Sequence, residues 1–277
     1  MIKLTRDRAR IHADFRGDKL FKKLVALVEA RVRDGKNIKF EGVIGDWTKA
    51  KKSLRSESHG KCAYCESDTE KVAHGDVEHF RPKSIYWWLA LCVDNYNFSC
   101  QLCNQTYKSD EFPVTGAQLV APDLPGALPL PVDAALKQLI ARIAPDPAVV
   151  TDAELLQKWF KEDSDLPNPY LEDPETLFAW AVSEVNEEVH LVPPAGANAR
   201  AQRAVESAIK YLGLNRETLT RSRFVVYEEL QLALLVWQTG NAEGKKRGEL
   251  HVKKMCSDDR QYVGMSRFFA RDAGFPI

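Results

Sequence analysis

The sequence has no long apolar run, no low-complexity tract, no internal repeat and no excess of charge of either sign. No stretch of about 18 apolar residues occurs among its 277 residues, so neither a transmembrane helix nor a membrane partner is expected. Residues 1–6 lead into basic sequence without the apolar core of a signal peptide, which predicts a cytoplasmic protein. The 39 basic and 39 acidic side chains cancel, which at first argues against a nucleic-acid partner.

This neutrality is a cancellation between segments of opposite charge. Residues 1–110 hold 21 basic and 15 acidic side chains (+6), residues 111–200 hold 5 and 15 (−10), and residues 201–277 hold 13 and 9 (+4). A basic N-terminal part therefore precedes an acidic middle. The acidic middle could dock on a basic partner, keep nucleic acid away from the back of the protein, or form a solvated helical face, and the sequence leaves these alternatives open.

Helical periodicity predicts an α+β fold that is mainly helical. Helices are expected over residues 18–34, 45–58, 133–144, 151–162, 199–212 and 215–240. Gly213 is expected to end the fifth of these and Asn215 to cap the sixth. We divide the chain into a basic helical N-terminal region (1–58), a core (59–113), a Pro-rich linker (114–132) and a helical C-terminal region (133–277).

Six cysteines are present, and four of them form two Cys-x2-Cys pairs. The pairs are Cys62 with Cys65 and Cys100 with Cys103. Two such pairs supply the four thiolates of a tetrahedral structural Zn²⁺ site, and disulfides are disfavoured in a cytoplasmic chain. Cys92 and Cys256 stand alone and are expected to be buried as small apolar side chains.

Polar residues near the two cysteine pairs carry the chemistry. Glu78 and His79 are adjacent in a short strand-like segment, so their side chains should point to opposite faces of a strand. Asn95 lies five residues before Cys100, and Asn104 directly follows Cys103. Lys108 lies four residues after Asn104, which places both on one face of a helix.

This arrangement resembles the HNH (ββα-metal) endonuclease family. His79 matches the first family letter, Asn95 the second and Asn104 the third, where Asn replaces the more common His. Glu78 stands where the family more often has Asp. The resemblance implies a zinc-stabilised ββα-metal core with flanking N-terminal helices and a helical C-terminal region, and a phosphodiester hydrolase that acts on nucleic acid.

Phosphodiester hydrolysis requires an activated water and relief of negative charge on the phosphate. His79 is the expected general base, because its ordinary pKa of about 6.5 lets it accept a proton near neutral pH. Glu78 and Asn104 offer oxygen ligands for a catalytic Mg²⁺ or Mn²⁺. By resemblance, Asn95 orients the motif. The residues expected to contact phosphate groups are Arg81, Lys83 and Lys108.

The resemblance extends to a branch of the family found in bacterial defence. The matching segments are Gly60–Glu66, Glu78–Lys83, Tyr86–Leu89, Phe98–Asn104 and, more weakly, Asp173–Glu175 and Leu212–Asn215. That branch includes the nuclease subunit of Septu-type antiphage systems and their retron-linked relatives, which implies an ABC/SMC-like ATPase partner. The sequence does not decide between DNA and structured RNA as substrate. A nonenzymatic zinc-knuckle adaptor, binding nucleic acid or a protein partner, is the alternative.

Overall fold

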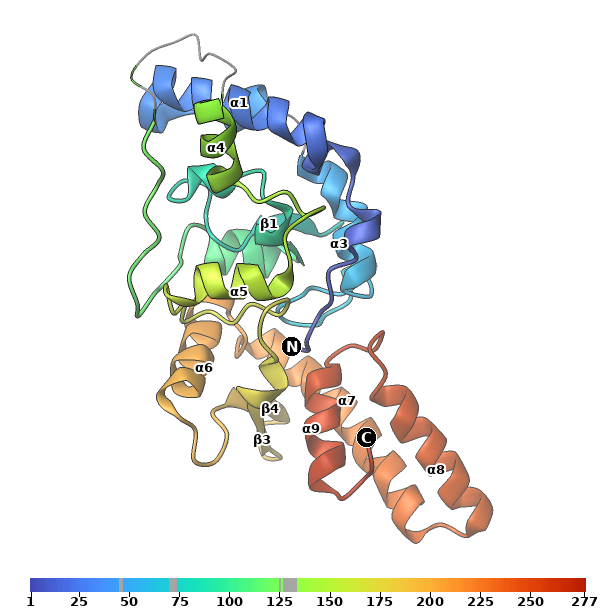
Figure 1. Ribbon diagram of the computed structural model, residues 1–277. Helices are drawn as coiled ribbons and strands as arrows, with labels where there is room; N and C mark the ends of the chain where they lie inside the picture. The colour runs from blue at the N-terminus through green and yellow to red at the C-terminus, as the bar shows by residue number, and fades with distance from the viewer. Residues whose placement is uncertain (45–46, 70–73, 125, 127–133) are drawn as a thin grey trace.

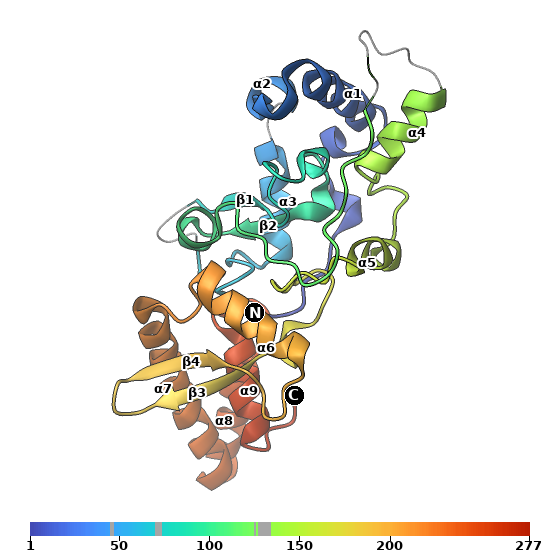
Figure 2. The same ribbon diagram turned by 90° about the vertical axis from the view of Figure 1, so that its left-hand side faces the viewer.

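The protein folds into two lobes that are joined end to end (Figures 1 and 2). The computed structural model describes residues 1–44, 47–69, 74–124, 126 and 134–277. Within these residues the fold is α+β, with two separate two-stranded sheets and a majority of helical elements. None of the helices in this described part combines the length and the apolar composition needed to cross a bilayer.

The N-terminal lobe surrounds the first sheet with helices. It contains α1 (Gly17–Asp34), α2 (Phe40–Ile44), α3 (Lys51–Glu57), β1 (Asp76–His79), β2 (Tyr96–Ser99), α4 (Ala134–Ile143) and α5 (Asp152–Phe160). The expected helix over 18–34 is confirmed as α1, which buries Leu20, Leu24 and Leu27 and ends where Gly35 takes a positive φ of 58°. The second expected helix, 45–58, is shorter: a 3₁₀ turn, Trp47–Ala50, leads into α3, and residues 45–46 lie outside the described part.

Strands β1 and β2 form an antiparallel pair in which Glu78 lies opposite Asn97 and His79 opposite Tyr96. A seven-residue π-helix, Leu102–Lys108, follows β2 closely. Helix α3 packs against both strands on the other side of the pair. This segment therefore folds as two antiparallel strands followed by a helical element.

Helices α4 and α5 join the hydrophobic core of the N-terminal lobe, although they follow the Pro-rich segment. Ile140, Leu155 and Trp159 are buried in the same cluster as Leu24 of α1 and Phe98 of β2. Helix α5 begins at a capping box, in which Thr151 and Glu154 satisfy each other's free backbone N–H groups. Part of the expected linker, namely residues 125 and 127–132, lies outside the described residues.

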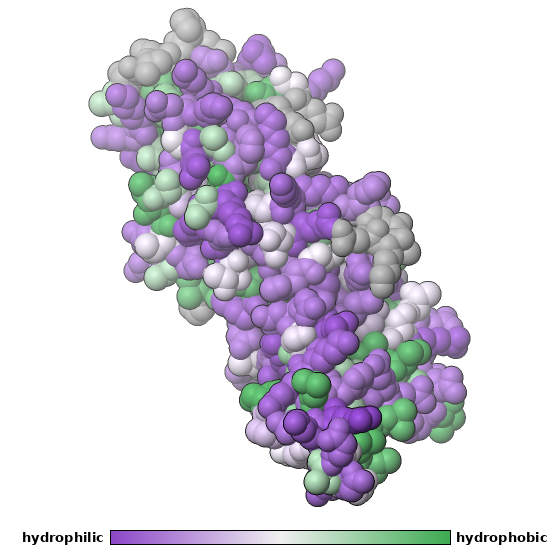
Figure 3. All heavy atoms as spheres, turned by 90° about the vertical axis from the view of Figure 1, so that its right-hand side faces the viewer, coloured by the Kyte–Doolittle hydropathy of each residue, from purple (hydrophilic) through white to green (hydrophobic). Residues whose placement is uncertain are grey.

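The C-terminal lobe combines a β-hairpin with a helical layer. Its elements are β3 (Ala179–Ser183), β4 (Glu188–Val192), α6 (Ala199–Leu212), α7 (Glu217–Thr239), α8 (Ala242–Met255) and α9 (Val263–Asp272). The hairpin was not expected from the sequence, which suggested a helical region throughout. Figure 3 shows a largely hydrophilic surface on the side where α3 lies, with hydrophobic groups gathered toward the C-terminal lobe.

Two predicted helix boundaries have different outcomes. Gly213 ends α6 as expected, with a φ of 61°, and its Cα is so close to the Tyr107 ring that a Cβ would lie 2.5 Å from it. Asn215 does not cap α7, because its side-chain amide instead forms hydrogen bonds of 2.8 and 2.9 Å with the backbone of Leu191 in β4. The side chain of Asn215 thus ties α7 to the hairpin.

The acidic middle supplies internal partners to basic side chains. Glu162 is fully buried and binds the Arg81 guanidinium at 2.7 Å, while Asp163 and Asp165 bind Arg203 at 2.6 and 2.8 Å. These three carboxylates are therefore engaged within the chain. They are not free acidic groups with which the acidic middle could dock on a basic partner. Reversing their charge would break internal ion pairs.

Candidate zinc and nuclease site

The four paired cysteines meet at one point, as the sequence predicts. The thiol sulfurs of Cys62, Cys65, Cys100 and Cys103 all lie within 4.8 Å of one another, and Cys65 Sγ is 3.9 Å from Cys100 Sγ. Tetrahedral Zn²⁺ with Zn–S bonds of about 2.3 Å places its sulfurs about 3.8 Å apart. The cluster therefore has the donor set and the spacing to bind a structural metal ion such as zinc.

A positive side chain accompanies the cysteine cluster. Arg216, just before α7, places Nη1 3.7 Å from Cys103 Sγ. Hydrogen bonding among the thiols lowers the pKa of Cys65 and of Cys100, whereas burial raises the pKa of Cys62 and hydrogen bonding from Cys100 raises that of Cys103. Zinc bound by four thiolates carries a net charge of −2, which a neighbouring guanidinium stabilises. The surroundings thus fit the ion as well as the ligands do.

Glu78 lies on the face of the β1–β2 pair that the cysteines occupy. Both of its carboxylate oxygens are engaged. Oε2 accepts a hydrogen bond of 2.5 Å from the hydroxyl of Tyr64, which stands between Cys62 and Cys65. Oε1 forms an ion pair of 2.6 Å with Nζ of Lys108 at the end of the π-helix. Glu78 is 1% exposed and Lys108 is fully buried, so this charge pair lies out of contact with water.

Tyr64 and Asn97 complete this polar group. Burial, reinforced by the Glu78 charge, raises the pKa of the Tyr64 hydroxyl well above its usual value, so the hydroxyl remains a donor to the carboxylate. Asn97 Nδ2 donates to the same hydroxyl at 2.8 Å. Neither residue was assigned a role from the sequence. For Asn97 the available signal was the strand register, which places it directly opposite Glu78.

His79 lies on the opposite face, among aromatic rings. Its ring centre is 4.8 Å from that of Tyr96 and 5.8 Å from that of Trp47, both in edge-on contacts. Its Nε2 is 3.1 Å from the carbonyl oxygen of Ala90, and because a carbonyl can only accept, Nε2 carries the hydrogen and Nδ1 keeps the lone pair. Burial lowers the pKa of His79 to about 3, so the ring is neutral and Nδ1 is its basic atom.

Asn95 is fully buried and holds the turn after β1. Its Oδ1 accepts from the backbone N–H of Arg81, and its Nδ2 donates to the backbone carbonyl of Arg81, both at 2.9 Å. The backbone carbonyl of Asn95 also accepts from the N–H of Phe80 at 2.8 Å. Asn95 therefore fixes the backbone of Phe80 and Arg81 directly after β1.

Asn104 is near a different carboxylate from the one expected. Its Nδ2 donates to Oδ2 of Asp76 at 3.2 Å, and Gln105 Nε2 donates to the same oxygen at 2.8 Å. Asp76 begins β1, two residues before Glu78, and was not assigned a role from the sequence. Carboxamide and carboxylate groups thus meet at Asp76, whereas Glu78 is paired with an ammonium group.

Two of the three expected phosphate contacts are buried and already paired. Lys108 binds Glu78 and donates to the His79 carbonyl at 3.1 Å, and Arg81 binds Glu162 with its guanidinium 4.6 Å from the Trp159 ring centre. Neither the Lys108 ammonium nor the Arg81 guanidinium could contact a phosphate without leaving its carboxylate partner. Lys83 is half-buried, with Nζ 5.0 Å from the centre of the Trp47 ring.

The unpaired cysteines are buried, as expected. Cys92 and Cys256 lie outside the cluster, and burial raises the pKa of their thiols to about 12 and about 11. Both are therefore protonated side chains that fill space in the two hydrophobic cores.

Over 77 aligned residues the chain is 36% identical to the Septu protein PtuB of Bacillus mycoides (strain KBAB4), a match that covers 23% of this chain. The chain spans about a quarter of that relative's length, 26%. No protein-family model matches the chain, and no solved structure matches it.

Proposed function

We propose that this protein is a zinc-stabilised endonuclease of the HNH type that hydrolyses phosphodiester bonds of DNA or structured RNA and acts in antiphage defence. The observation that carries the proposal is the placement of His79 and Glu78 on one strand, directed to opposite faces, beside four clustered cysteines. The similarity to the Septu protein PtuB supports the role in defence.

In this proposal His79 acts as the general base once its aromatic surroundings open, because the buried ring, with a pKa of about 3, is too weak a base to take a proton from water near neutral pH. Its Nε2–H bond to the Ala90 carbonyl fixes the tautomer and directs the lone pair of Nδ1 away from that carbonyl. Asn95 fixes the backbone of Arg81, two residues after His79, and so limits the movement of the end of β1. The ring is only 8% exposed, so an attacking water requires an opening of the aromatic surroundings.

The predicted ligands of a catalytic Mg²⁺ or Mn²⁺ do not present a vacant pair of oxygens. Both carboxylate oxygens of Glu78 are engaged, by the Tyr64 hydroxyl and by the Lys108 ammonium at 2.6 Å, and the Asn104 side chain is held at Asp76 through its Nδ2. As arranged, these residues do not fit a divalent cation held between Glu78 and Asn104. Such an ion could bind Glu78 only after the ammonium has left the carboxylate, so dependence on a divalent cation is a question for the cleavage assay.

The decisive comparison is between His79→Ala and His251→Ala in a cleavage assay. Plasmid, single-stranded DNA and RNA are offered with and without added Mg²⁺ or Mn²⁺, and with EDTA, while bound zinc is measured in each sample. We expect His79→Ala to retain its zinc, to melt somewhat earlier because the missing ring leaves a cavity beside Trp47 and Tyr96, and to cleave about 10²–10⁴-fold more slowly because the general base is gone. His251 is in α8 and binds Glu229, so its variant should cleave normally.

Full cleavage by His79→Ala would refute the assignment. The competing interpretation, a nonenzymatic zinc-knuckle adaptor, draws support from the burial of both Glu78 and His79. It predicts that the unaltered protein binds nucleic acid or protein but cleaves none of the three substrates under any metal condition.

We further propose that the protein works with an ABC/SMC-like ATPase. The family resemblance and the similarity to a Septu protein support this partner. Co-expression followed by affinity purification and mass measurement of the complex tests it. An ATPase encoded beside this protein that does not co-purify, with and without ATP, would count against the proposal.

A further inference from the structure

A cavity lined by basic and hydroxyl side chains runs along α3. Its volume is about 770 Å³, and it is lined by Thr48, Lys51, Lys52, Arg55, Ser56, His59, Gly60 and His74. We call it the α3 cavity. Three of its side chains are permanent cations, two are histidines, and none of the eight is acidic. Such a lining favours an anionic occupant.

The acidic residue of α3 faces away from this cavity. Glu57 accepts hydrogen bonds from Arg6 and from the Tyr170 hydroxyl, both at 2.7 Å. Lys51 and Lys52, by contrast, have no carboxylate within 4 Å among the residues that the structure describes. Within the described part of the chain, the positive charge of these two ammonium groups is therefore not neutralised by an ion pair.

The α3 cavity borders the turn that contacts His79. Thr48, which lines the cavity, directly follows Trp47, whose ring centre lies 5.8 Å from that of His79. Lys83 Nζ lies 5.0 Å from the centre of that same Trp47 ring. An extended anion bound in the α3 cavity would therefore lie close to Trp47, the neighbour of His79, which is the candidate general base.

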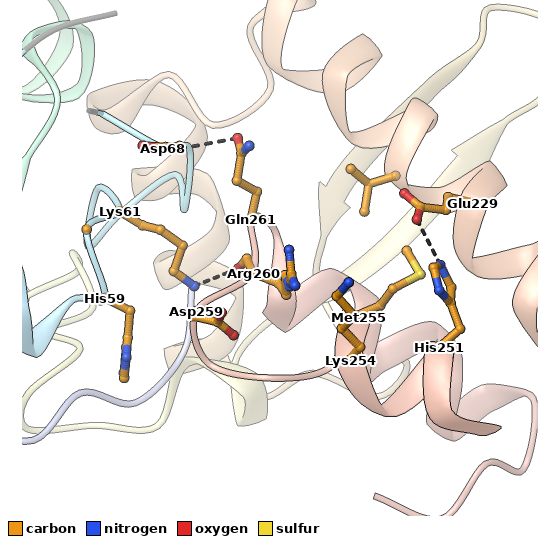
Figure 4. A pocket seen from close by; sticks show the side chains of 12 residues that line it. His59, Lys61, Asp68, Glu229, His251, Lys254, Met255, Asp259, Arg260 and Gln261 are labelled. Carbon is orange, nitrogen blue, oxygen red and sulfur yellow. Dashed lines mark hydrogen bonds and ion pairs between the residues drawn. The ribbon is translucent and has the colours of Figure 1, made fainter. Parts of the chain in front are cut away.

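The neighbouring cavity differs in charge. It shares His59 and Gly60 with the α3 cavity, has a volume of about 480 Å³, and lies between the segment 59–61 and the end of α8 (Figure 4). Its cations are balanced by Asp68, Glu229 and Asp259, and Lys61 donates to the carbonyl of Arg260 at 2.7 Å. Of these two cavities, only the α3 cavity has a lining that contains basic side chains and no acidic ones.

We propose that the α3 cavity binds the phosphodiester backbone of the nucleic acid and directs it to His79. This inference rests on the proposed function and replaces Arg81 and Lys108, both buried and paired, as the phosphate contacts. Among the described residues no Phe, Tyr or Trp side chain lines the cavity, and its permanent cations favour contacts with phosphates, which carry no sequence information.

The test compares two charge reversals of equal size. Lys51→Glu/Lys52→Glu alters the α3 cavity, and Lys245→Glu/Lys246→Glu alters an adjacent pair of exposed lysines on α8. Both are made in the His79→Ala background, and binding is measured in EDTA by fluorescence anisotropy. Labelled single-stranded DNA, duplex DNA and RNA of one sequence are the probes, over a series of salt concentrations, with zinc content checked.

We expect the α3 reversal to weaken binding at least about tenfold at 0.1 M salt, and the α8 reversal to weaken it less than about twofold. Loss of two phosphate contacts should also reduce the slope of log K against log salt by about 1.8 for duplex or about 1.4 for a single strand. Equal weakening by both reversals, or none by the α3 reversal, would overturn the proposal.

Two further outcomes are decisive. If poly-glutamate displaces the nucleic acid as effectively as unlabelled DNA does, the α3 cavity fits an acidic protein instead, and the proposal is wrong. If the double variant melts earlier than its parent, Lys52→Glu alone, at an exposed position, should still show half of the slope change. Because binding is measured without cleavage, a protein that binds through α3 but never cleaves contradicts only the proposed function.

Discussion

Glu78 and His79 are neighbours on β1, yet their surroundings have little in common. Glu78 is enclosed by an ammonium group, a phenol hydroxyl and, through that hydroxyl, an amide. His79 is enclosed by the rings of Trp47 and Tyr96, and its ring forms a hydrogen bond with a backbone carbonyl. One face of the β1–β2 pair is stabilised by buried charge and the other by apolar contacts between neutral groups.

The difference matters for how each face responds to change. A buried carboxylate that loses its partner retains a charge away from water, which is costly. A neutral ring that loses a neighbour leaves a gap or an unmet hydrogen bond, which costs less. The charged face should therefore determine whether the fold holds together, and the neutral face should tolerate the opening that a water needs to reach His79.

The largest expected effect is loss of the metal from the charged face. Cys100→Ser removes one of four thiolates, and Tyr64, which donates to Glu78, is held between two of the others. We expect bound zinc and melting temperature to fall together, because the free energy of metal binding is part of the folding free energy. Zinc is measured by elemental analysis and melting by calorimetry.

Cys92→Ala is the matched control, since Cys92 is buried but lies outside the cluster. It should keep full zinc content while melting somewhat earlier. A Cys100→Ser protein with unchanged zinc and unchanged melting would remove the structural role of the cluster.

The next effect isolates the buried charge pair. Lys108→Met removes the ammonium and leaves the Glu78 carboxylate unpaired, which should lower the free energy of unfolding by about 3–5 kcal/mol. Adding Glu78→Gln to that variant should restore a large part of the loss, because no unpaired charge then remains. Denaturant titration measures both, and a loss below about 1 kcal/mol for Lys108→Met would show that the pair contributes little.

The sequence predicted what depends on local spacing. Two Cys-x2-Cys pairs define their own ligand geometry, and the period of a strand sends Glu78 and His79 to opposite faces, so both features could be read from short segments. The same holds for α1, whose apolar stripe and final Gly35 are local signals. The convergence of the four cysteines is confirmed.

The sequence could not predict which distant side chains would meet. Lys108 pairs with Glu78 across 30 residues, and Arg81 with Glu162 across 81, and no local pattern indicates either pairing. The hairpin β3–β4 was missed because a five-residue strand leaves a weak periodic signal beside long helices. The roles of His79, Asn95 and Asn104 in cleavage stay predictions.

An intermediate loss of stability is expected at the turn after β1, which Asn95 holds in place. Asn95→Ala removes two hydrogen bonds and leaves the backbone N–H and carbonyl of Arg81 unmet. Because Asn95 is fully buried, we expect a loss of about 2–3 kcal/mol of stability without a loss of zinc. Zinc released in proportion to the lost stability would show that the turn and the cluster are not separate, and would weaken the contrast between the faces.

The smallest effect tests the neutral face alone. The Tyr96 hydroxyl and His79 Nε2 both donate to the Ala90 carbonyl. Tyr96→Phe removes one donor, yet the carbonyl keeps the other and the ring still packs against His79, so the loss should be about 1 kcal/mol. Denaturant titration beside Lys108→Met gives the comparison directly. If Tyr96→Phe costs as much as Lys108→Met, buried charge is not what distinguishes the two faces, and the neutral face is as constrained as the charged one.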